Sequence, residues 1–361
     1  MSISAHTYKH GKTIAIFRSG RMGDFLVALP ALKAIKEKYP NCRIIYITFI
    51  SSANRVRKQV AHYMQPDVIP PWIELVKPDL IDEVLLLKAT FDIPSIRSAR
   101  LIIAAQDITK TYILPYPSET SKRLWIKMLY LRLLGVKGRI YGWRKSVPLQ
   151  TPVAEAALSP LGPEALARFR EGNLFYRPKA HAGGGKILED KIFKSVGVRF
   201  AIVYAGSTHE HKRWPLTNFV TLCRKLVGEY GFLIVLVGSK SEKTLHEQLK
   251  NKIGVHSCIN VAGDTSLTDL AHILQRASLF IGNDGGIAHL ASTMGTQTIT
   301  IMSGIYPSGV WDPSGANCMA VRVQGLPCIG CASEDTCPAG HMSCIRNLSV
   351  NDVLTACLSR L

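Results

Sequence analysis

A glycine-rich turn at residues 282–291 has the residue types that suit a diphosphate site. It lies between an apolar run at 279–281, which predicts a buried strand, and an apolar helix pattern that ends at Gly295. The amides of a first helical turn have no partner within the helix, and glycines let a phosphate approach them closely. Asp284 and His289 add polar groups to this turn. The same pattern also starts helices that bind no phosphate, so a purely structural turn is the alternative.

A carboxylate, Asp24, follows the first apolar run in a Gly-Arg-Met-Gly-Asp turn. At the end of a strand it can accept a proton from an acceptor hydroxyl and raise the nucleophilicity of that oxygen. The structural alternative is a cap, in which Asp24 binds free amides at the start of the next helix. Arg18 and Arg21 belong to the same turn. We expect these two cations to contact an anionic acceptor.

Two further cations, Lys212 and Arg213, precede a Trp-Pro pair in which Pro215 is suited to begin a helix. Both can neutralise a diphosphate leaving group, and an arginine can do so through two parallel hydrogen bonds. The alternative is a pair of surface cations beside a packed tryptophan. His289 presents the same choice, since a helical histidine either donates to a phosphate or only packs.

Four of the nine cysteines lie within a short segment: Cys328, Cys331, Cys337 and Cys344. Thiols at this density favour a structural zinc or iron site over disulfides. The spacing is shorter than in common zinc modules, so a metal-free folded loop is the alternative. We expect the other five cysteines to be small buried hydrophobic residues.

The net charge of +18 is concentrated in the first part of the chain. Residues 1–150 carry 24 Lys and Arg against 10 Asp and Glu, whereas residues 151–361 carry 20 against 16. We therefore expect the first part to meet an anionic partner. At 122–145, cations that include Lys122, Arg123 and Lys127 alternate with bulky apolar residues, which suits either a membrane-surface helix or a solvated helix face. No nucleic-acid recognition pattern accompanies the charge, so we expect no nucleic-acid partner.

Strand and helix patterns alternate twice along the 361 residues. In the first series we expect strands at 13–17, 43–49, 83–87 and 101–105, and helices at 25–38, 52–64 and 122–134. In the second we expect strands at 198–204, 232–237, 279–281 and 298–302, and helices at 217–229, 242–252 and 267–276. Residues 148–194 between them are predicted to be irregular. Continuous apolar strands between amphipathic helices predict two parallel sheets covered on both faces.

Ligands of such doubly wound α/β domains bind beyond the carboxyl ends of the strands, where all three polar segments lie. We expect the two domains to face a central cleft, with their boundary between residues 185 and 186. No apolar run is long enough for a transmembrane helix, and no signal peptide is recognisable, so a cytoplasmic location is expected.

The motifs occur in an order that resembles glycosyltransferase family 9, the bacterial heptosyltransferases of lipopolysaccharide core assembly. The resemblance rests on residues 18–24 followed by Leu-Pro-Ala-Leu at 29–32, then on 212–215, then on 283–291. It implies a GT-B fold of two Rossmann-like domains. Residues 1–185 would bind the acceptor, and residues 186–361, with a cysteine-rich loop at 326–346, would bind ADP-heptose.

The resemblance also implies roles for individual residues. Asp24 corresponds to the general base and Lys212 to the lysine on the donor phosphates, with Arg213 beside it. Asp284, Gly285, Gly286 and His289 correspond to the diphosphate loop, and Glu242 to a ribose ligand. One departure is Gly285, because the family often has Thr or Ser there, so one hydroxyl contact to the nucleotide sugar is missing.

The function expected on this basis is inverting transfer of a heptose from ADP-heptose to an inner-core lipopolysaccharide hydroxyl, without a catalytic metal. The partners would be the nucleotide sugar, an anionic lipopolysaccharide precursor and the inner face of the cytoplasmic membrane, where the protein would be peripheral. One alternative is another nucleotide sugar or a protein acceptor on the same fold. A different class of alternative is a non-catalytic protein that binds anions and a metal.

Overall fold

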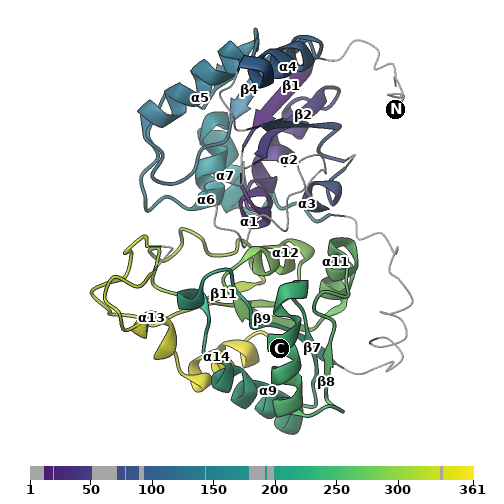
Figure 1. The fold of residues 1–361 in the computed structure, drawn as a ribbon, viewed down its shortest axis with the longest axis vertical. Helices are drawn as coiled ribbons and strands as arrows, with labels where there is room; N and C mark the ends of the chain where they lie inside the picture. The colour runs from purple at the N-terminus through teal and green to yellow at the C-terminus, as the bar shows by residue number, and fades with distance from the viewer. Residues whose placement is uncertain are drawn as a thin grey trace. The chain divides into compact units, whose positions relative to one another are not determined.

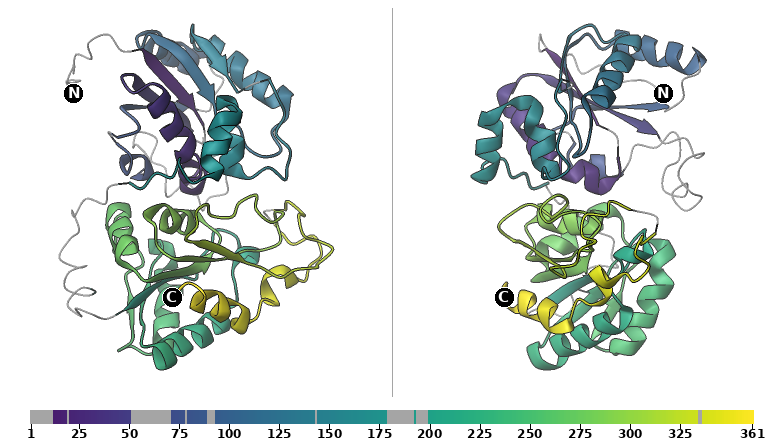
Figure 2. Two further views of the ribbon diagram at one scale, coloured as in Figure 1. Left: turned by 180° about the vertical axis from the view of Figure 1, so that it is seen from behind. Right: turned by 90° about the vertical axis from the view of Figure 1, so that its left-hand side faces the viewer.

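The computed structural model describes residues 12–361 except for residues 19, 51–70, 78, 89–92, 143, 179–191, 193–198 and 334–335. The chain divides into two compact units, Met1–Tyr176 and Arg177–Leu361 (Figure 1). The helix expected at 52–64 and the domain boundary expected between 185 and 186 lie outside the described residues. Each unit is a parallel sheet with helices on both faces (Figure 2).

The first unit has a five-stranded sheet in the order β3-β2-β1-β4-β5. Its strands are β1 Thr13–Phe17, β2 Arg43–Ile50, β3 Glu83–Lys88, β4 Ile108–Ile113 and β5 Arg139–Tyr141. Its helices are α1 Met22–Leu26, α2 Leu29–Lys38, α3 Pro71–Glu74, α4 Ile93–Ala104, α5 Ser121–Leu133, α6 Val153–Leu158 and α7 Pro163–Arg170. Helices α4 and α5 share one core with alternate residues of the strands, including Phe17 and Ile113. Helices α2, α6 and α7 pack on one another.

The second unit has a six-stranded sheet in the order β11-β10-β9-β6-β7-β8. Its strands are β6 Phe200–Tyr204, β7 Leu233–Leu236, β8 Cys258–Asn260, β9 Leu279–Asn283, β10 Thr298–Ile301 and β11 Cys318–Val321. Its helices are α9 Leu216–Tyr230, α10 Lys243–Ile253, α11 Leu267–Arg276, α12 Gly286–Met294, α13 Ser343–Arg346 and α14 Val350–Leu358. The core under α9 and α14 includes Trp214, Phe219 and Cys357. The prediction of two doubly wound α/β domains is confirmed.

Several local predictions were wrong, and the clearest concerns residues 101–105. Residues 101–104 belong to the end of α4 and not to a strand, because Ala99 and Ile103 face the core at helical spacing while Leu101 points outward. The strand of this region is β4, which begins at Ile108. An apolar run of this length does not distinguish a strand from the end of a helix.

The predicted helix at 25–38 is two helices, α1 and α2, and Pro30 lies in the first turn of the second, where a proline is tolerated. The region predicted to be irregular contains α6 and α7. Short strands β5, β8 and β11 were missed, because three or four residues carry too little pattern. Within the described part of the chain, no helix is long and apolar enough to span a membrane.

Candidate active site

The turn between β9 and α12 is anchored by Asn283, a side chain that the sequence did not single out. The Asn283 side-chain oxygen accepts the Trp214 amide at 3.0 Å. Its amide nitrogen donates to the carbonyl groups of Ala205 and Gly206 at 2.9 and 3.0 Å. Asn283 is fully buried. This one side chain therefore joins the end of β6, the segment before α9 and the first residues of the turn.

Three predicted donor residues come together at this turn. Lys212 lies at the end of a short 3-10 helix, Glu210–Lys212, and its Nζ donates to Asp284 Oδ2 at 2.9 Å. His289 is buried in α12. Burial lowers the pKa of His289, Asp284 partly offsets this, and Lys212 adds to it. The arrangement places a cation, a carboxylate and a predominantly neutral imidazole beside the first turn of a helix.

The two glycines of the turn leave room next to the backbone. Gly285 is the residue before α12 and has an extended backbone with φ of 171°. A Cβ atom added to Gly285 would meet only Tyr204 Cε1, at 3.5 Å, which is ordinary van der Waals contact. Gly286 begins the helix, so its amide is one of those without a partner inside the helix. The space at Gly285 would accept the hydroxyl side chain that family members often carry there.

Glu242 is held at the carboxyl ends of β6 and β7. Its Oε2 accepts the amide and hydroxyl of Ser239 at 2.8 and 2.7 Å, and its Oε1 accepts the Tyr204 hydroxyl at 3.1 Å. A Cβ on Gly206 would lie 1.9 Å from Glu242 Oε1, so a larger residue there would displace the Glu242 carboxylate. These contacts orient the carboxylate, and its role as a ribose ligand stays a prediction.

His246, which the sequence did not single out, supports the same region. Its Nε2 accepts the Ala205 amide at 3.3 Å, so its Nδ1 carries the proton and donates to the Glu242 carbonyl at 2.9 Å. Burial lowers the pKa of His246. Arg213 also stabilises the local backbone, because its Nε and Nη2 both donate to the Ser207 carbonyl. Its predicted contact with the donor stays a prediction.

Asp24 lies in the first turn of α1, at the carboxyl end of β1. Its Oδ2 accepts the Arg21 amide at 2.7 Å, so the capping contact proposed as the structural alternative is present. Gly20 has φ of +141°, and a Cβ there would lie within 2.6 Å of both Asp24 Cβ and the Tyr116 hydroxyl. Glycine is therefore required at residue 20, and it allows Asp24 and Tyr116 to lie near each other.

Arg18 is an internal residue, only 1% exposed. Its Nε donates to the Asp24 carbonyl at 3.0 Å, and its Nη1 donates to the Pro115 carbonyl at 3.0 Å. Its guanidinium lies 4.0 Å from the centre of the Tyr116 ring. Arg18 thus joins the ends of β1 and β4 behind Asp24. Arg21 is exposed. The predicted contacts of both arginines with an acceptor stay predictions.

A buried network beside Asp24 escaped the sequence analysis. Lys127 forms an ion pair with Glu119, whose other oxygen accepts the Tyr116 amide at 2.9 Å. Burial raises the pKa of Tyr116 and lowers that of Lys127. The expectation that Lys127 belongs to the exposed basic surface was wrong, because its helix turns this side chain toward Glu119. Nothing in the spacing of these residues identified the pair.

The four clustered cysteines form no disulfide. Amides of the segment after Cys337 donate to its sulfur and lower its pKa. Burial raises the pKa of Cys344, and the neighbouring Cys328, Cys331 and Cys337 raise it further. Among the residues that the structure describes, however, no group of three or more potential ligands could hold a metal ion. The structural metal site stays a prediction.

The sequence model of glycosyltransferase family 9 (heptosyltransferase) matches residues 185–341. Lipooligosaccharide heptosyltransferase 2 of Haemophilus ducreyi is 35% identical over 86 residues, which cover 23% of this chain and 24% of that relative. This match therefore spans only about a quarter of the relative's length. Lipooligosaccharide heptosyltransferase 2 of Campylobacter jejuni is 22% identical over 349 residues, covering 92% of this chain and 93% of the relative.

The solved structure of Escherichia coli ADP-heptose lipopolysaccharide heptosyltransferase II has the same fold. Its TM-score is 0.66 at 15% identity, over 97% of this chain and 98% of that one. The two Rossmann-like units are accordingly those of a GT-B fold. The family match includes Lys212 and the turn before α12, where the charged residues lie together. The resemblance to glycosyltransferase family 9 seen in the motifs is confirmed by the family model over residues 185–341.

Proposed function

We propose that this protein is an inverting glycosyltransferase that moves a heptose from ADP-heptose to a hydroxyl group of the lipopolysaccharide inner core. It would act as a peripheral protein at the inner face of the cytoplasmic membrane. The observation that carries the proposal is the Lys212–Asp284 pair at the amino end of α12, within the segment that matches the family. Heptosyltransferases are also the relatives with which the chain aligns along most of its length.

The first step is binding of the donor diphosphate at α12. The helix supplies unpaired amides and a positive dipole end, and Lys212 supplies a full charge. Lys212 Nζ donates to Asp284 Oδ2 at 2.9 Å. An incoming diphosphate competes with Asp284 for Lys212. His289, with its lowered pKa, adds a neutral polar group and no second positive charge.

The second step is attack by the acceptor hydroxyl on the anomeric carbon. Asp24 accepts the hydroxyl proton while the new carbon–oxygen bond forms, and the bond from the anomeric carbon to the diphosphate breaks with its electron pair leaving on ADP. The Arg21 amide and the buried Arg18 orient the turn that carries Asp24. Attack from the face opposite the leaving group inverts the anomeric configuration.

No metal is required in this scheme, because Lys212 and the α12 amides stabilise the charge that develops on the diphosphate. A chelator such as EDTA should therefore leave turnover unchanged. The cysteine loop is a separate matter, and we propose a structural zinc or iron there. Elemental analysis of protein purified without added metal should find about one ion per chain. Metal-free protein with four titratable thiols at these positions would show the folded-loop alternative instead.

The decisive test is ADP release from a panel of nucleotide sugars with and without a purified inner-core acceptor. We expect release from ADP-heptose that depends on the acceptor. The open space at Gly285 favours one further candidate, a different nucleotide sugar, because the hydroxyl common in the family is missing there. Acceptor-dependent release from another nucleotide sugar would establish that candidate. Binding without release from any donor would support the non-catalytic alternative.

A further inference from the structure

Helices α4 and α5 expose most of the large apolar side chains that reach solvent in the described part of the first unit. Ile93 is 78% and Leu101 is 71% exposed, and the others lie between 41% and 50%. The full set is Ile93, Leu101 and Ile102 on α4, and Trp125, Ile126, Leu129 and Leu133 on α5. The opposite sides of both helices supply the core. The exposed residues are therefore not part of the buried core beneath the sheet.

On α5, three of these apolar residues form a continuous stripe with Lys122. Lys122, Ile126, Leu129 and Leu133 are separated by four, three and four residues, which places them on one side of a helix. On α4, Ile93, Arg97 and Leu101 lie on successive turns. We refer to the exposed apolar residues of both helices together with Arg97, Arg100, Lys122 and Arg123 as the α4–α5 face.

All charges on the α4–α5 face have the same sign, since neither helix contains an Asp or Glu. Arg97, Arg100, Lys122 and Arg123 are exposed beside the apolar residues. Lys127, the remaining lysine of α5, turns inward to Glu119. Aliphatic side chains and a tryptophan surrounded by cations match an anionic bilayer, in which the apolar groups enter the interface and the cations meet lipid phosphates.

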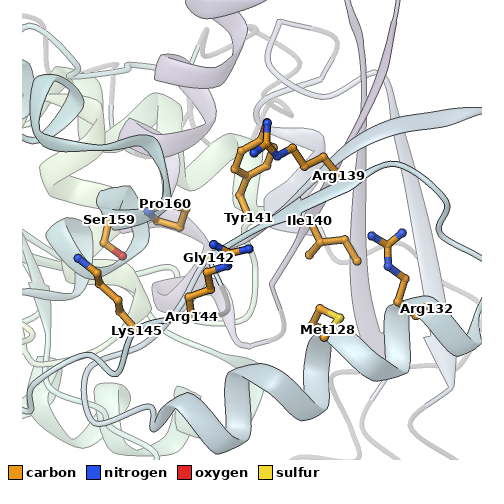
Figure 3. Close-up of a pocket in the computed structure, with 10 residues that line it drawn as sticks. All are labelled: Met128, Arg132, Arg139, Ile140, Tyr141, Gly142, Arg144, Lys145, Ser159 and Pro160. Atoms are coloured by element: carbon orange, nitrogen blue, oxygen red, sulfur yellow. The ribbon is translucent and has the colours of Figure 1, made fainter.

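A basic pocket adjoins this face along α5 (Figure 3). Its volume is about 420 Å³, and its lining contains Arg132, Arg139, Arg144 and Lys145 but no carboxylate. Met128 and Arg132 line it from α5, and Arg139 and Tyr141 line it from β5 (Figure 3). Arg132 is held by two carbonyl groups beyond the end of α5, at 2.7 and 2.8 Å. Four cations around one cavity suit a phosphate group.

We propose that the α4–α5 face seats the first unit on an anionic phospholipid bilayer and that the adjoining pocket receives a lipid phosphate. This inference deepens the proposed function, because a lipid-linked acceptor would then be presented at the membrane surface. A second copy of the chain is a poorer occupant, since pairing two such faces would bring like charges together. The exposed aliphatic side chains also offer little to a nucleic acid, whose bases stack on aromatic rings.

The first experiment measures sedimentation of the full chain with vesicles. One set is phosphatidylcholine alone, and the other contains equal parts of phosphatidylcholine and phosphatidylglycerol. We expect binding to the anionic vesicles that weakens as salt passes ~0.15 M, where exposed charges are screened beyond about 8 Å. Equal binding to neutral vesicles, or no binding to either set at low salt, would overturn the proposal.

Substitutions then separate the charged and apolar parts of the face. Lys122→Gln with Arg123→Gln should weaken binding to anionic vesicles roughly ten-fold or more, because each cation is attracted to the surface. Trp125→Ser with Leu129→Ser should remove the binding that survives at high salt. The matched control is Arg224→Gln with Lys252→Gln, which removes two exposed cations from the second unit and should leave binding unchanged. Equal losses of vesicle binding in the α4–α5 face variants and in the control variant would contradict specific membrane binding by this face.

The pocket has its own test, Arg139→Gln with Lys145→Gln. This variant should bind vesicles that contain phosphatidic acid less tightly than the parent does. Inorganic phosphate added to the parent should lower its vesicle binding by a smaller factor than these substitutions do. Full competition by millimolar inorganic phosphate would identify a site for free phosphate and refute the lipid assignment. Loss of a dimer in the Trp125→Ser, Leu129→Ser variant by ultracentrifugation would refute the membrane assignment. No donor or acceptor is present, so failure here is distinguishable from failure of the transferase proposal, which ADP release tests.

Discussion

The turn before α12 and the turn before α1 both follow the carboxyl end of a strand, yet they hold their charged residues differently. In the second unit, Lys212 and Asp284 are partners of each other and lie beside the helix amides. In the first unit, Asp24 is held by a backbone amide, and Arg18 is buried behind it with carbonyl groups as partners. The first arrangement is suited to exchanging an ion pair for a ligand. The second is suited to holding one carboxylate still.

The difference matters because Lys212 can change its partner when a ligand binds, whereas the hydrogen bonds of Arg18 hold the fold together. Lys212 loses one partner when a diphosphate arrives and gains another. Arg18 has no such exchange available, since its hydrogen-bond partners are backbone carbonyl groups, of Asp24 in the following turn and of Leu114 and Pro115 at the end of β4. Substitutions in the first turn should therefore affect stability and turnover together unless the hydrogen-bonding pattern is preserved. Those in the second should affect ligand affinity.

The largest effect is expected at Asp24, where catalysis and capping have to be separated. Asp24→Asn keeps an oxygen for the Arg21 amide but removes the base. It should lower turnover roughly 100-fold or more, the usual scale for loss of a general base, with the melting temperature nearly unchanged. Asp24→Ala should lower both. Turnover of Asp24→Asn close to that of the parent, in the ADP-release assay, would remove Asp24 from the mechanism.

The next effect concerns the exchangeable ion pair. Lys212→Ala should weaken ADP binding by about 1.5 to 3 kcal/mol, the scale of a charge-assisted hydrogen bond. It also leaves the Asp284 carboxylate next to the diphosphate without a counter-ion. The double variant Lys212→Ala, Asp284→Asn should therefore bind ADP more tightly than Lys212→Ala alone. Calorimetry that shows unchanged ADP affinity in Lys212→Ala would argue against this placement of the phosphates.

A smaller effect is expected from acid, through the support of Glu242. The pKa of His246 lies below its ordinary value of 6.5 in the folded chain. The unfolded chain therefore takes up a proton first as the pH falls, so the free energy of unfolding should decrease below about pH 6.5. Protonation would also place an N–H opposite the Ala205 amide. Denaturant unfolding at pH 7.5 and 5.5 should show a smaller acid loss for His246→Gln than for the parent; an equal loss would exclude His246 as the cause.

The smallest effect is predicted for a gain of function at the second turn. Gly285→Ser meets only Tyr204 Cε1 at 3.5 Å, so the fold should tolerate it. The new hydroxyl should leave ADP affinity unchanged or raise it by about 0.5 to 1.5 kcal/mol, the net value of one hydrogen bond. Gly206→Ser is the matched control, since its Cβ would collide with Glu242 and should destabilise the second unit. Weaker ADP binding by Gly285→Ser would show that this space belongs to the ligand.

Most elements of the second unit were predictable because its strands and helices are long enough to show a periodic pattern. Helix α11, for example, begins with a Ser-x-x-Asp capping box and has the predicted bounds Leu267–Arg276. Around the candidate site, the sequence identified Lys212, Asp284 and His289 as a group. It offered no signal for Asn283 or His246, because their importance comes from contacts with carbonyl and amide groups on other segments.

The amino-acid sequence by itself determined the two α/β domains, the resemblance to glycosyltransferase family 9 and the three motifs, since these depend on local periodicity and on residue types at short spacing. Only the tertiary structure decided which way the charged side chains face. Arg18 and Lys127 turn inward because Pro115 and Glu119 lie beside them, whereas the apolar residues of α4 turn outward because Ala99 and Ile103 already fill the core. Those outcomes depend on which distant segments pack together, and the spacing of residues within one segment does not predict such contacts.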